Sequence, residues 1–310
     1  MNNPFLIFAA VLALGAAHTF AQASKATQSM HQEGKIRLFY YTTGQQAVDP
    51  LDANQNQIPD QVEDVLLQTQ AAQTLWIDVL GFPDPFQTER FHSASFLDIH
   101  FRHKDVLKAN GVTYDELQHF NKPGDPKDTV SICFNVATSV KAPANLTPAH
   151  EFFHLVQNST TYFKNRWFTE GTARWSERGL GTGALGPAKV LSAWPLPESE
   201  RAALFQRTYD ASEHFWNPLA KAHGTNDSLP PGSALERLQA MRYTDGSPVL
   251  KDLQLTGWRL IRNVITELAQ GDDEAFKELG YDRWSEDNQK SPQNDAFIMK
   301  AIERAMAKMP

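Results

Sequence analysis

Two histidines and a glutamate within one short segment have the residue types and the spacing that bind a metal ion. The segment His150-Glu151-Phe152-Phe153-His154 carries its two imidazoles four positions apart. Residues four apart lie on one face of a helix, so both rings can reach one ion, with Glu151 beside them. The flanking residues are apolar, which predicts a buried helix. Burial of His150, Glu151 and His154 is costly unless they have a functional role. The spacing therefore predicts a metal site with a carboxylate next to it.

A third ligand has to support this interpretation, because a helix with two hydrogen-bonded histidines matches the same pattern. Catalytic zinc takes three protein ligands and keeps one position open. The single cysteine, Cys133, lies in an apolar segment typical of a core, so the ligand must be His, Asp or Glu. Glu170 follows His154 by sixteen residues, which allows a turn and a returning second helix. The structural alternative for Glu170 is a first-turn carboxylate after a Thr169 cap, or a partner of Arg174.

These segments resemble the gluzincin metallopeptidases, in which two histidines and a distal glutamate hold zinc. The resemblance is carried by HEFFHLVQ at residues 150–157 and WFTEGTARW at residues 167–175, with the glutamate in an EGxA context. It is closest to secreted bacterial metalloproteases of the peptidase MA type, whose Asp/Asn-rich N-terminal segment is similar to residues 52–60. The motifs cover roughly residues 35–220. The gap before Glu170 is shorter than in the best-known gluzincins and requires a tight turn.

The resemblance implies a zinc metallopeptidase that acts on a peptide or protein substrate. His150, His154 and Glu170 would hold zinc. Glu151 would act as general base toward a zinc-activated water. Two alternatives remain open. One is a zinc hydrolase with a non-peptide substrate, and the other is a catalytically retired protein of the same fold that acts as a binding module. The intact Glu151 argues against the retired form.

Two supporting roles follow from the same chemistry. The developing oxyanion needs a donor, which gluzincins supply as a Tyr or His from the downstream region. Tyr209 is the first candidate, His214 and His223 are alternatives, and all three also suit ordinary helix residues. Ligating imidazoles need an acceptor on their second nitrogen, for which Gln157 and Asn135 are candidates.

A second metal site is predicted in a loop near the N-terminus. Six residues occupy positions 1, 3, 5, 7, 9 and 12 of a twelve-residue loop with the oxygen-ligand spacing of an EF-hand: Asp52, Asn54, Asn56, Ile58, Asp60 and Glu63. Gln57 replaces the usual glycine at position 6, and Pro59 removes a donor at position 8. Calcium bound here would be structural. The alternative is an Asx-rich turn in which Pro59 begins the next helix.

The elements that must position these groups are predicted as strands first and helices later. Alternation and β-branched composition predict strands over residues 36–43, 96–102, 111–114 and 129–136. Apolar spacing predicts helices over 60–80, from Thr147 as N-cap, and over 169–179, 198–222, 232–242, 255–269 and 294–308. Residues 24–34 are expected to be frayed.

This order predicts an α+β fold with two lobes, and the resemblance to gluzincins implies that the fold is zincin-like. Residues 24–179 would form a sheet-bearing N-terminal lobe with the metal-binding helices. Residues 180–310 would form a helical C-terminal lobe, with 180–197 as the loop or hinge between them.

The N-terminus and the net charge indicate where the protein works. Residues 1–23 combine an apolar run with the small-residue site Ala21-Gln22-Ala23, which predicts a cleaved signal peptide and a secreted or periplasmic protein. The n-region lacks Lys and Arg, so an uncleaved N-terminal anchor is the alternative. The formal net charge of −7 argues against nucleic acid or an anionic membrane as partner. No membrane association is expected after signal removal.

Overall fold

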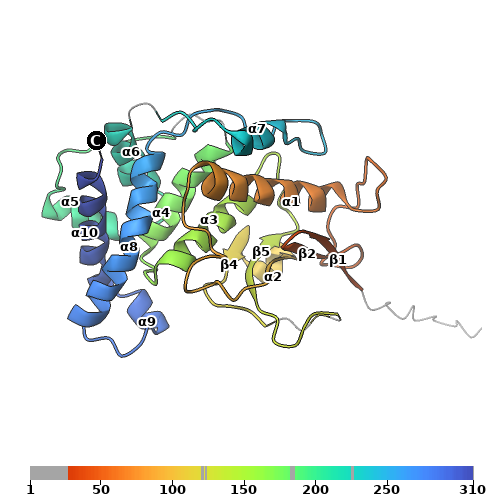
Figure 1. Cartoon of the computed structure of the whole chain (residues 1–310), viewed down its shortest axis with the longest axis horizontal. Coiled ribbons are helices and arrows are strands. Elements are labelled where there is room, and N and C mark those ends of the chain that lie inside the picture. The colour runs from red at the N-terminus through yellow and green to blue at the C-terminus, as the bar shows by residue number, and fades with distance from the viewer. Residues whose placement is uncertain (1–26, 120–121, 123, 182–185, 225–226, 310) are drawn as a thin grey trace, which may run out of the picture.

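The chain forms a mixed α/β structure in which most of the helices follow the last strand (Figure 1). The computed structural model describes residues 27–119, 122, 124–181, 186–224 and 227–309. The predicted signal peptide, residues 1–23, lies outside this range. None of the helices in the described part of the chain combines the length and the apolar character needed to cross a membrane.

A five-stranded mixed sheet occupies one end of the molecule, with the strand order β1-β2-β3-β5-β4. The strands are β1 (Gln28–Glu33), β2 (Ile36–Tyr41), β3 (Phe96–Arg102), β4 (Gly111–Thr113) and β5 (Ser131–Ala137). The three central strands run parallel, and β1 and β4 are antiparallel edges. Every residue of β5 is buried, in keeping with a central parallel strand.

Residues 24–26 lie outside the described residues, and the predicted fraying is wrong for the rest of residues 24–34, because Gln28–Glu33 pairs along its whole length with β2. The turn between the two strands places Gly34 at φ 55°, a conformation that glycine adopts without steric cost. β1 is polar because it is an edge strand, so it lacks the apolar alternation by which strands are recognised.

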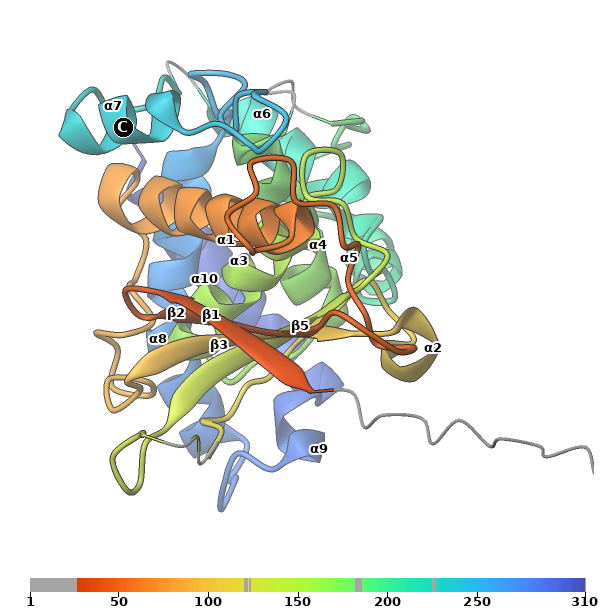
Figure 2. The same ribbon diagram turned by 90° about the vertical axis from the view of Figure 1, so that its right-hand side faces the viewer.

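The helices lie partly between the strands in sequence and mostly after the last strand. They are α1 (Asp60–Gln73) with a π-helical end (Thr74–Val79), α2 (Lys104–Leu107), α3 (Thr147–Thr160), α4 (Arg166–Ser176) with a 3-10 turn (Glu177–Gly179), α5 (Glu198–Phe205), a π-helix (Ser212–Trp216), α6 (Asn217–His223), α7 (Ser233–Ala240), α8 (Trp258–Glu278), α9 (Glu286–Gln289), a 3-10 turn (Pro292–Asn294) and α10 (Asp295–Ala307). α1 and α3 lie on the same side of the sheet (Figure 2). α8 and α10 pack side by side at the far end (Figure 1).

The start of α3 differs in detail from the prediction. Thr147 was expected as the N-cap, but it is the first helical residue and Leu146 precedes it. The capping oxygen comes from Asn145, whose Oδ1 accepts hydrogen bonds from Thr147 N at 2.9 Å and Thr147 Oγ1 at 2.7 Å. Asn145 therefore satisfies an N–H at the helix start that has no partner within the helix.

Aromatic packing beneath α3 fixes this helix against its neighbours. The ring of Phe153 lies 5.1 Å from Trp76, 5.7 Å from Phe82 and 6.3 Å from Trp175, measured between centroids. These side chains come from α3, the end of α1, the loop after it and α4. Because Phe153 is anchored on the core side of α3, the helix turns His150 and His154 to its other side.

The five residues that connect α3 to α4 are held by carboxylates from the C-terminal helices. Asp272 of α8 accepts hydrogen bonds from Thr161 Oγ1 at 2.7 Å and Tyr162 N at 2.8 Å. Asp295, the first residue of α10, accepts from Asn165 Nδ2 at 2.8 Å and from Trp167 Nε1 at 2.6 Å. The tight connection that the short spacing required is therefore made, and it is braced from residues more than a hundred positions later.

Candidate metal centre

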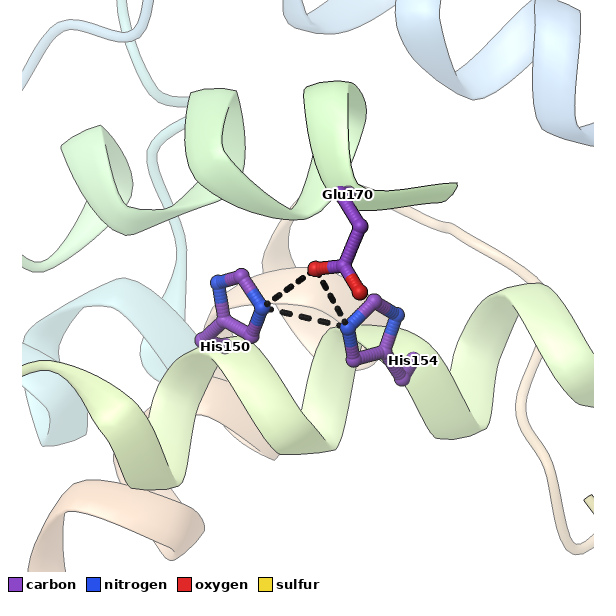
Figure 3. A group of neighbouring side chains, drawn as sticks. All are labelled: His150, His154 and Glu170. Atoms are coloured by element: carbon purple, nitrogen blue, oxygen red, sulfur yellow. Dashed lines mark hydrogen bonds and ion pairs between the residues drawn. The ribbon is translucent and has the colours of Figure 1, made fainter. Parts of the chain in front are cut away.

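Three side chains from α3 and α4 converge on one point (Figure 3). Nε2 of His150 lies 3.1 Å from Nε2 of His154, and Oε2 of Glu170 lies 3.4 Å and 3.5 Å from these two atoms. The two imidazoles stand one turn apart on α3, and Glu170 reaches them from the second turn of α4. We call these residues the His/Glu cluster. Among the described residues it is the group of three such side chains whose ligand atoms lie within 4.8 Å of one another.

The protonation of His154 follows from its neighbour Gln157. The amide nitrogen of Gln157 donates to Thr169 O at 2.9 Å and to Thr172 Oγ1 at 2.6 Å, which fixes the orientation of the amide. Its Oε1 therefore faces Nδ1 of His154, at 2.7 Å, as an acceptor. Nδ1 must carry the hydrogen, and in the neutral ring Nε2 presents a lone pair to the cluster.

His150 is oriented in the same way by a residue that the sequence did not single out. Its Nδ1 lies 3.0 Å from Oε1 of Glu177, and Arg174 binds the other oxygen of Glu177 at 2.5 Å. Glu177 follows Glu170 by seven residues, which is the spacing of one helix face and the one signal that could have found it. Asn135, the other proposed acceptor, instead donates to Tyr114 Oη at 3.1 Å.

The contacts of Glu170 fit a ligand better than either structural alternative. α4 begins at Arg166, so Glu170 lies beyond the first turn, and Arg174 pairs with Glu177 and not with it. Arg166 lies 3.7 Å from Oε1. The other oxygen, Oε2, is buried, and its contacts with Nε2 of His150 at 3.4 Å and of His154 at 3.5 Å are at the limit of hydrogen bonding. A buried carboxylate oxygen in that position needs a cation or a proton.

The pKa values of the cluster residues are set by their contacts with one another. Burial lowers the pKa of His150, but hydrogen bonds with Glu170 and Glu177 outweigh it and raise the pKa to about 9. Burial opposes ionisation of Glu170, yet His150 and His154 hold the pKa of its carboxyl well below the usual range. Two imidazoles and a carboxylate thus hold one additional proton between them. The N2O donor set and its size fit zinc, which would compete with that proton.

Glu151 lies beside the cluster and is closely packed against β4. Burial raises the pKa of its carboxyl, against the attraction of both histidines. Thr113 of β4 donates to Glu151 Oε2 at 2.7 Å. The backbone of Gly111 passes so close that a Cβ there would lie 2.3 Å from Oε1 of Glu151. Strand β4 therefore fixes the position of this carboxylate, and glycine is needed where it passes.

The cluster opens into a cleft of about 1060 Å³. Its lining includes the residues of β4, Arg166, Tyr209 and the segment around α9. Tyr209 is 50 % exposed, and its ring centroid lies 6.1 Å from that of His150. Burial and the charge of Glu170 raise the pKa of the Tyr209 hydroxyl, so it stays a donor. The alternative donors, His214 and His223, do not line this cleft.

The N-terminal loop is closed by its own side chains. Asp52 accepts hydrogen bonds from the backbone of Asn56 at 3.1 Å and Gln57 at 2.8 Å, and Glu63 accepts from the amide of Asn56 at 2.7 Å. Gln57 has φ 72°, so it adopts the left-handed conformation for which position 6 normally uses glycine. Asp60 accepts from Ala53 N at 3.1 Å. These contacts suit an Asx-rich turn, and calcium binding stays a prediction.

Comparison with known proteins adds no relative. No protein-family model matches the chain, and no curated protein or solved structure is significantly similar to it. The proposed function therefore rests on the geometry of the side chains.

Proposed function

We propose that this chain is a zinc-dependent peptidase of the zincin-like, gluzincin type. The observation that carries the proposal is the convergence of two imidazole Nε2 atoms and a buried carboxylate oxygen, with both Nδ1 atoms already engaged. Two histidines and one glutamate are a ligand set of catalytic zinc, which leaves a position open. When bound, zinc polarises a carbonyl and lowers the pKa of water.

The residues around the site have the positions that such a reaction requires. Glu151, with its raised pKa, accepts a proton from the attacking water and transfers it to the leaving amine. Thr113 donates to Oε2 of Glu151 and so restricts the orientation of this carboxylate. The Tyr209 hydroxyl donates a hydrogen bond to the oxygen that becomes negative as the carbonyl is attacked. The proton lost by water thus ends on the amine, and the C–N bond breaks.

The edge strand β4 supports a peptide substrate over other carbonyl compounds. β4 pairs with β5 on one side and is the last strand of the sheet, so its outer N–H and C=O groups face away from the sheet. Gly111, Val112 and Thr113 all line the cleft. An extended peptide can add to such an edge through main-chain hydrogen bonds, which would lay its backbone past Glu151. A non-peptide substrate has no use for this edge.

Export remains part of the proposal and rests on residues 1–23 alone. The mass of the mature protein, recovered from the periplasm or medium, tests it. A chain that begins at Ser24 agrees with cleavage after Ala23, and an intact N-terminus in the membrane fraction would favour the uncleaved anchor.

The decisive experiment compares the unmutated protein with Glu151→Gln and Glu170→Ala. Each is purified, its zinc is measured by mass spectrometry, and each is incubated with a diverse peptide mixture. We expect one zinc per chain and peptide cleavage for the unmutated protein. Glu151→Gln should keep the zinc and lose cleavage, and Glu170→Ala should lose both.

The alternatives predict different results. A retired binding module of the same fold would keep zinc and bind peptides without cutting them, in the unmutated protein as in Glu151→Gln. A non-peptide hydrolase would keep zinc and leave every peptide intact and unbound. Stoichiometric zinc in Glu170→Ala would remove Glu170 from the ligand set.

A further inference from the structure

Lys164 places an ammonium group in the wall of the cleft that contains the His/Glu cluster. Its side chain is 15 % exposed. Nζ donates to Oδ1 of Asn158 and lies 3.6 Å from Oδ2 of Asp115. An ammonium group has three N–H donors. Asn158 and Asp115 are its two acceptors among the described residues. The third N–H of Nζ can therefore donate to a molecule in the cleft.

The surroundings of Lys164 favour the approach of a negative charge. Arg90 lies nearby, and its guanidinium donates to backbone carbonyl oxygens, while Asp115 and Asp272 offset part of its charge. Burial, together with Arg90, lowers the pKa of Lys164 to about 7, although Asp115 opposes both. A second carboxylate beside Nζ would interact with two cations and restore the full charge of Lys164.

The wall around Lys164 is rigid enough to select a ligand. Its backbone N–H donates to the carbonyl of Gln289 at 2.8 Å. The indole of Trp284 stacks on Tyr162, with 5.2 Å between centroids and 3° between planes. Trp284 and Gln289 also line the cleft. The indole edge can pack against the methylene groups of an acidic side chain, while the ammonium group binds its carboxylate.

The distance to the reacting bond follows from the helix. Asn158, which accepts from Lys164, stands one turn beyond His154 on α3. Four residues of helix advance about 6 Å, and an extended peptide advances about 3.3 Å per residue. A carboxylate at Lys164 would therefore belong to a residue about two positions from the bond that is cut.

We propose that Lys164 is a specificity-determining residue that binds a substrate carboxylate in this part of the cleft. The inference rests on the proposed peptidase function and names the substrate class of the same site. The carboxylate has two possible sources, an acidic side chain or a free C-terminus, and both present the same group to Nζ.

The test uses matched peptides that differ only in this group. One pair carries Glu or Gln inside an amidated peptide, and the other is a neutral peptide with a free or an amidated C-terminus. kcat/KM is measured for each pair with the unmutated protein, Lys164→Met, Lys164→Arg and Lys290→Met. Binding of the same peptides to Glu151→Gln is measured by calorimetry, so that the preference is read without turnover.

We expect the unmutated protein to prefer one acidic member by about tenfold or more, the range of a charged hydrogen bond. Lys164→Met should abolish that preference through KM and leave neutral peptides unaffected, and Lys164→Arg should restore part of it. Lys290→Met, an exposed cation of the same cleft that pairs with Glu286, should keep the preference. The pair that responds identifies a side-chain or a terminal carboxylate.

The two proposals fail in different ways. Cleavage without an acidic preference in either pair would overturn the role of Lys164 and leave the peptidase standing. Absence of cleavage by the unmutated protein would overturn the peptidase, and the calorimetric comparison would still decide the preference. An equal loss for acidic and neutral peptides in Lys164→Met, with zinc and melting temperature unchanged, would also overturn the specificity role. Should Lys164→Met fail to fold, the peptide pairs on the unmutated protein decide by themselves.

Discussion

Oε1 of Glu177 lies 3.0 Å from Nδ1 of His150, at the opposite edge of the ring from Glu170. The imidazole is thus held between two carboxylates. Glu177 faces its Nδ1, and Glu170 lies beside its Nε2, where both could bind the same cation. A carboxylate behind a ligating histidine fixes its tautomer and raises its basicity. Glu177 belongs to the proposed zinc site although it does not touch the zinc.

Glu177→Gln should weaken zinc binding without abolishing it. The amide can still accept from Nδ1 but brings no charge, so zinc affinity should fall by about 10–100-fold. Competition with a chromogenic chelator measures the change. Glu303→Gln, which alters an exposed carboxylate on α10, is the control. Equal affinities for Glu177→Gln and the unmutated protein would limit Glu177 to its salt bridge with Arg174.

Gly111→Ala should reduce turnover while the zinc stays bound. The added Cβ would lie 2.3 Å from Oε1 of Glu151 and displace that carboxylate. A misplacement of about 1 Å at a catalytic group costs about 10²-fold in rate. kcat from single-turnover cleavage, beside zinc content, measures the effect. Unchanged kcat would mean that Glu151 is free to shift, contrary to its close packing against β4.

Tyr209→Phe should lower kcat and leave KM almost unchanged. Loss of one oxyanion donor typically costs about 10²–10³-fold in kcat, and the ring itself would remain in place. Steady-state kinetics on one good peptide measures both constants. His214→Gln serves as the control, because His214 lies outside the cleft. A Tyr209→Phe protein with full activity would exclude the hydroxyl as donor.

Asp272 should make the protein less stable as the pH rises through neutrality. Burial raises the pKa of its carboxyl to about 7, although Thr161 and Tyr162 donate to it. An unfolded aspartate titrates near 3.9. Between about pH 4 and 7 the folded chain therefore keeps a proton that the unfolded chain releases, and its free energy of unfolding falls with rising pH.

The comparison of Asp272→Asn with Asp273→Asn isolates this effect, because residue 273 is the exposed neighbour. Urea unfolding at pH 5 and pH 8 should show a loss of about 3 kcal/mol for the unmutated protein. The same loss should appear in Asp273→Asn and be much reduced in Asp272→Asn. Parallel pH profiles for all three would assign the dependence to other groups.

Calcium should raise the melting temperature if the Asp52 loop binds it. A ligand at 100 times its Kd adds about 2.7 kcal/mol to the stability of the folded state. The measurement is a thermal melt of zinc-loaded protein with calcium or magnesium, repeated on Glu63→Gln, which removes a charge at position 12. Identical melting temperatures in all samples would leave an Asx-rich turn, as the hydrogen bonds of Asp52 and Asn56 suggest.

Local patterns were enough to place much of the fold. The strand predicted over residues 96–102 is confirmed to the residue, because β3 alternates and is bounded by loops. The last helix is found within one residue of its predicted ends. The helix predicted over 255–269 instead runs to Glu278, since a single glycine, Gly271, costs a helix only about 1 kcal/mol.

Other features needed the tertiary structure. The predicted helix 198–222 is broken between Phe205 and Ser212, and Gly171 of α4 allows the indole of Trp216 to approach closely. A Cβ at Gly171 would lie 2.6 Å from that indole. In the candidate site, His150, Glu151 and His154 are one helical turn and visible in the sequence. Thr113 and Lys164 come from elements whose meeting depends on the whole fold.

The carboxylates of Asp272 and Asp295 have a consequence for the timing of activity. All of the proposed zinc ligands have been synthesised by residue 170, yet the connection that sets Glu170 against the histidines is bonded to helices made more than a hundred residues later. A nascent or truncated chain would carry the ligands without the geometry, so we expect it to bind zinc weakly. The proposed peptidase would then become active only after translation is complete and the chain has folded at its destination. Proteins of the cell that synthesises it would not be cleaved.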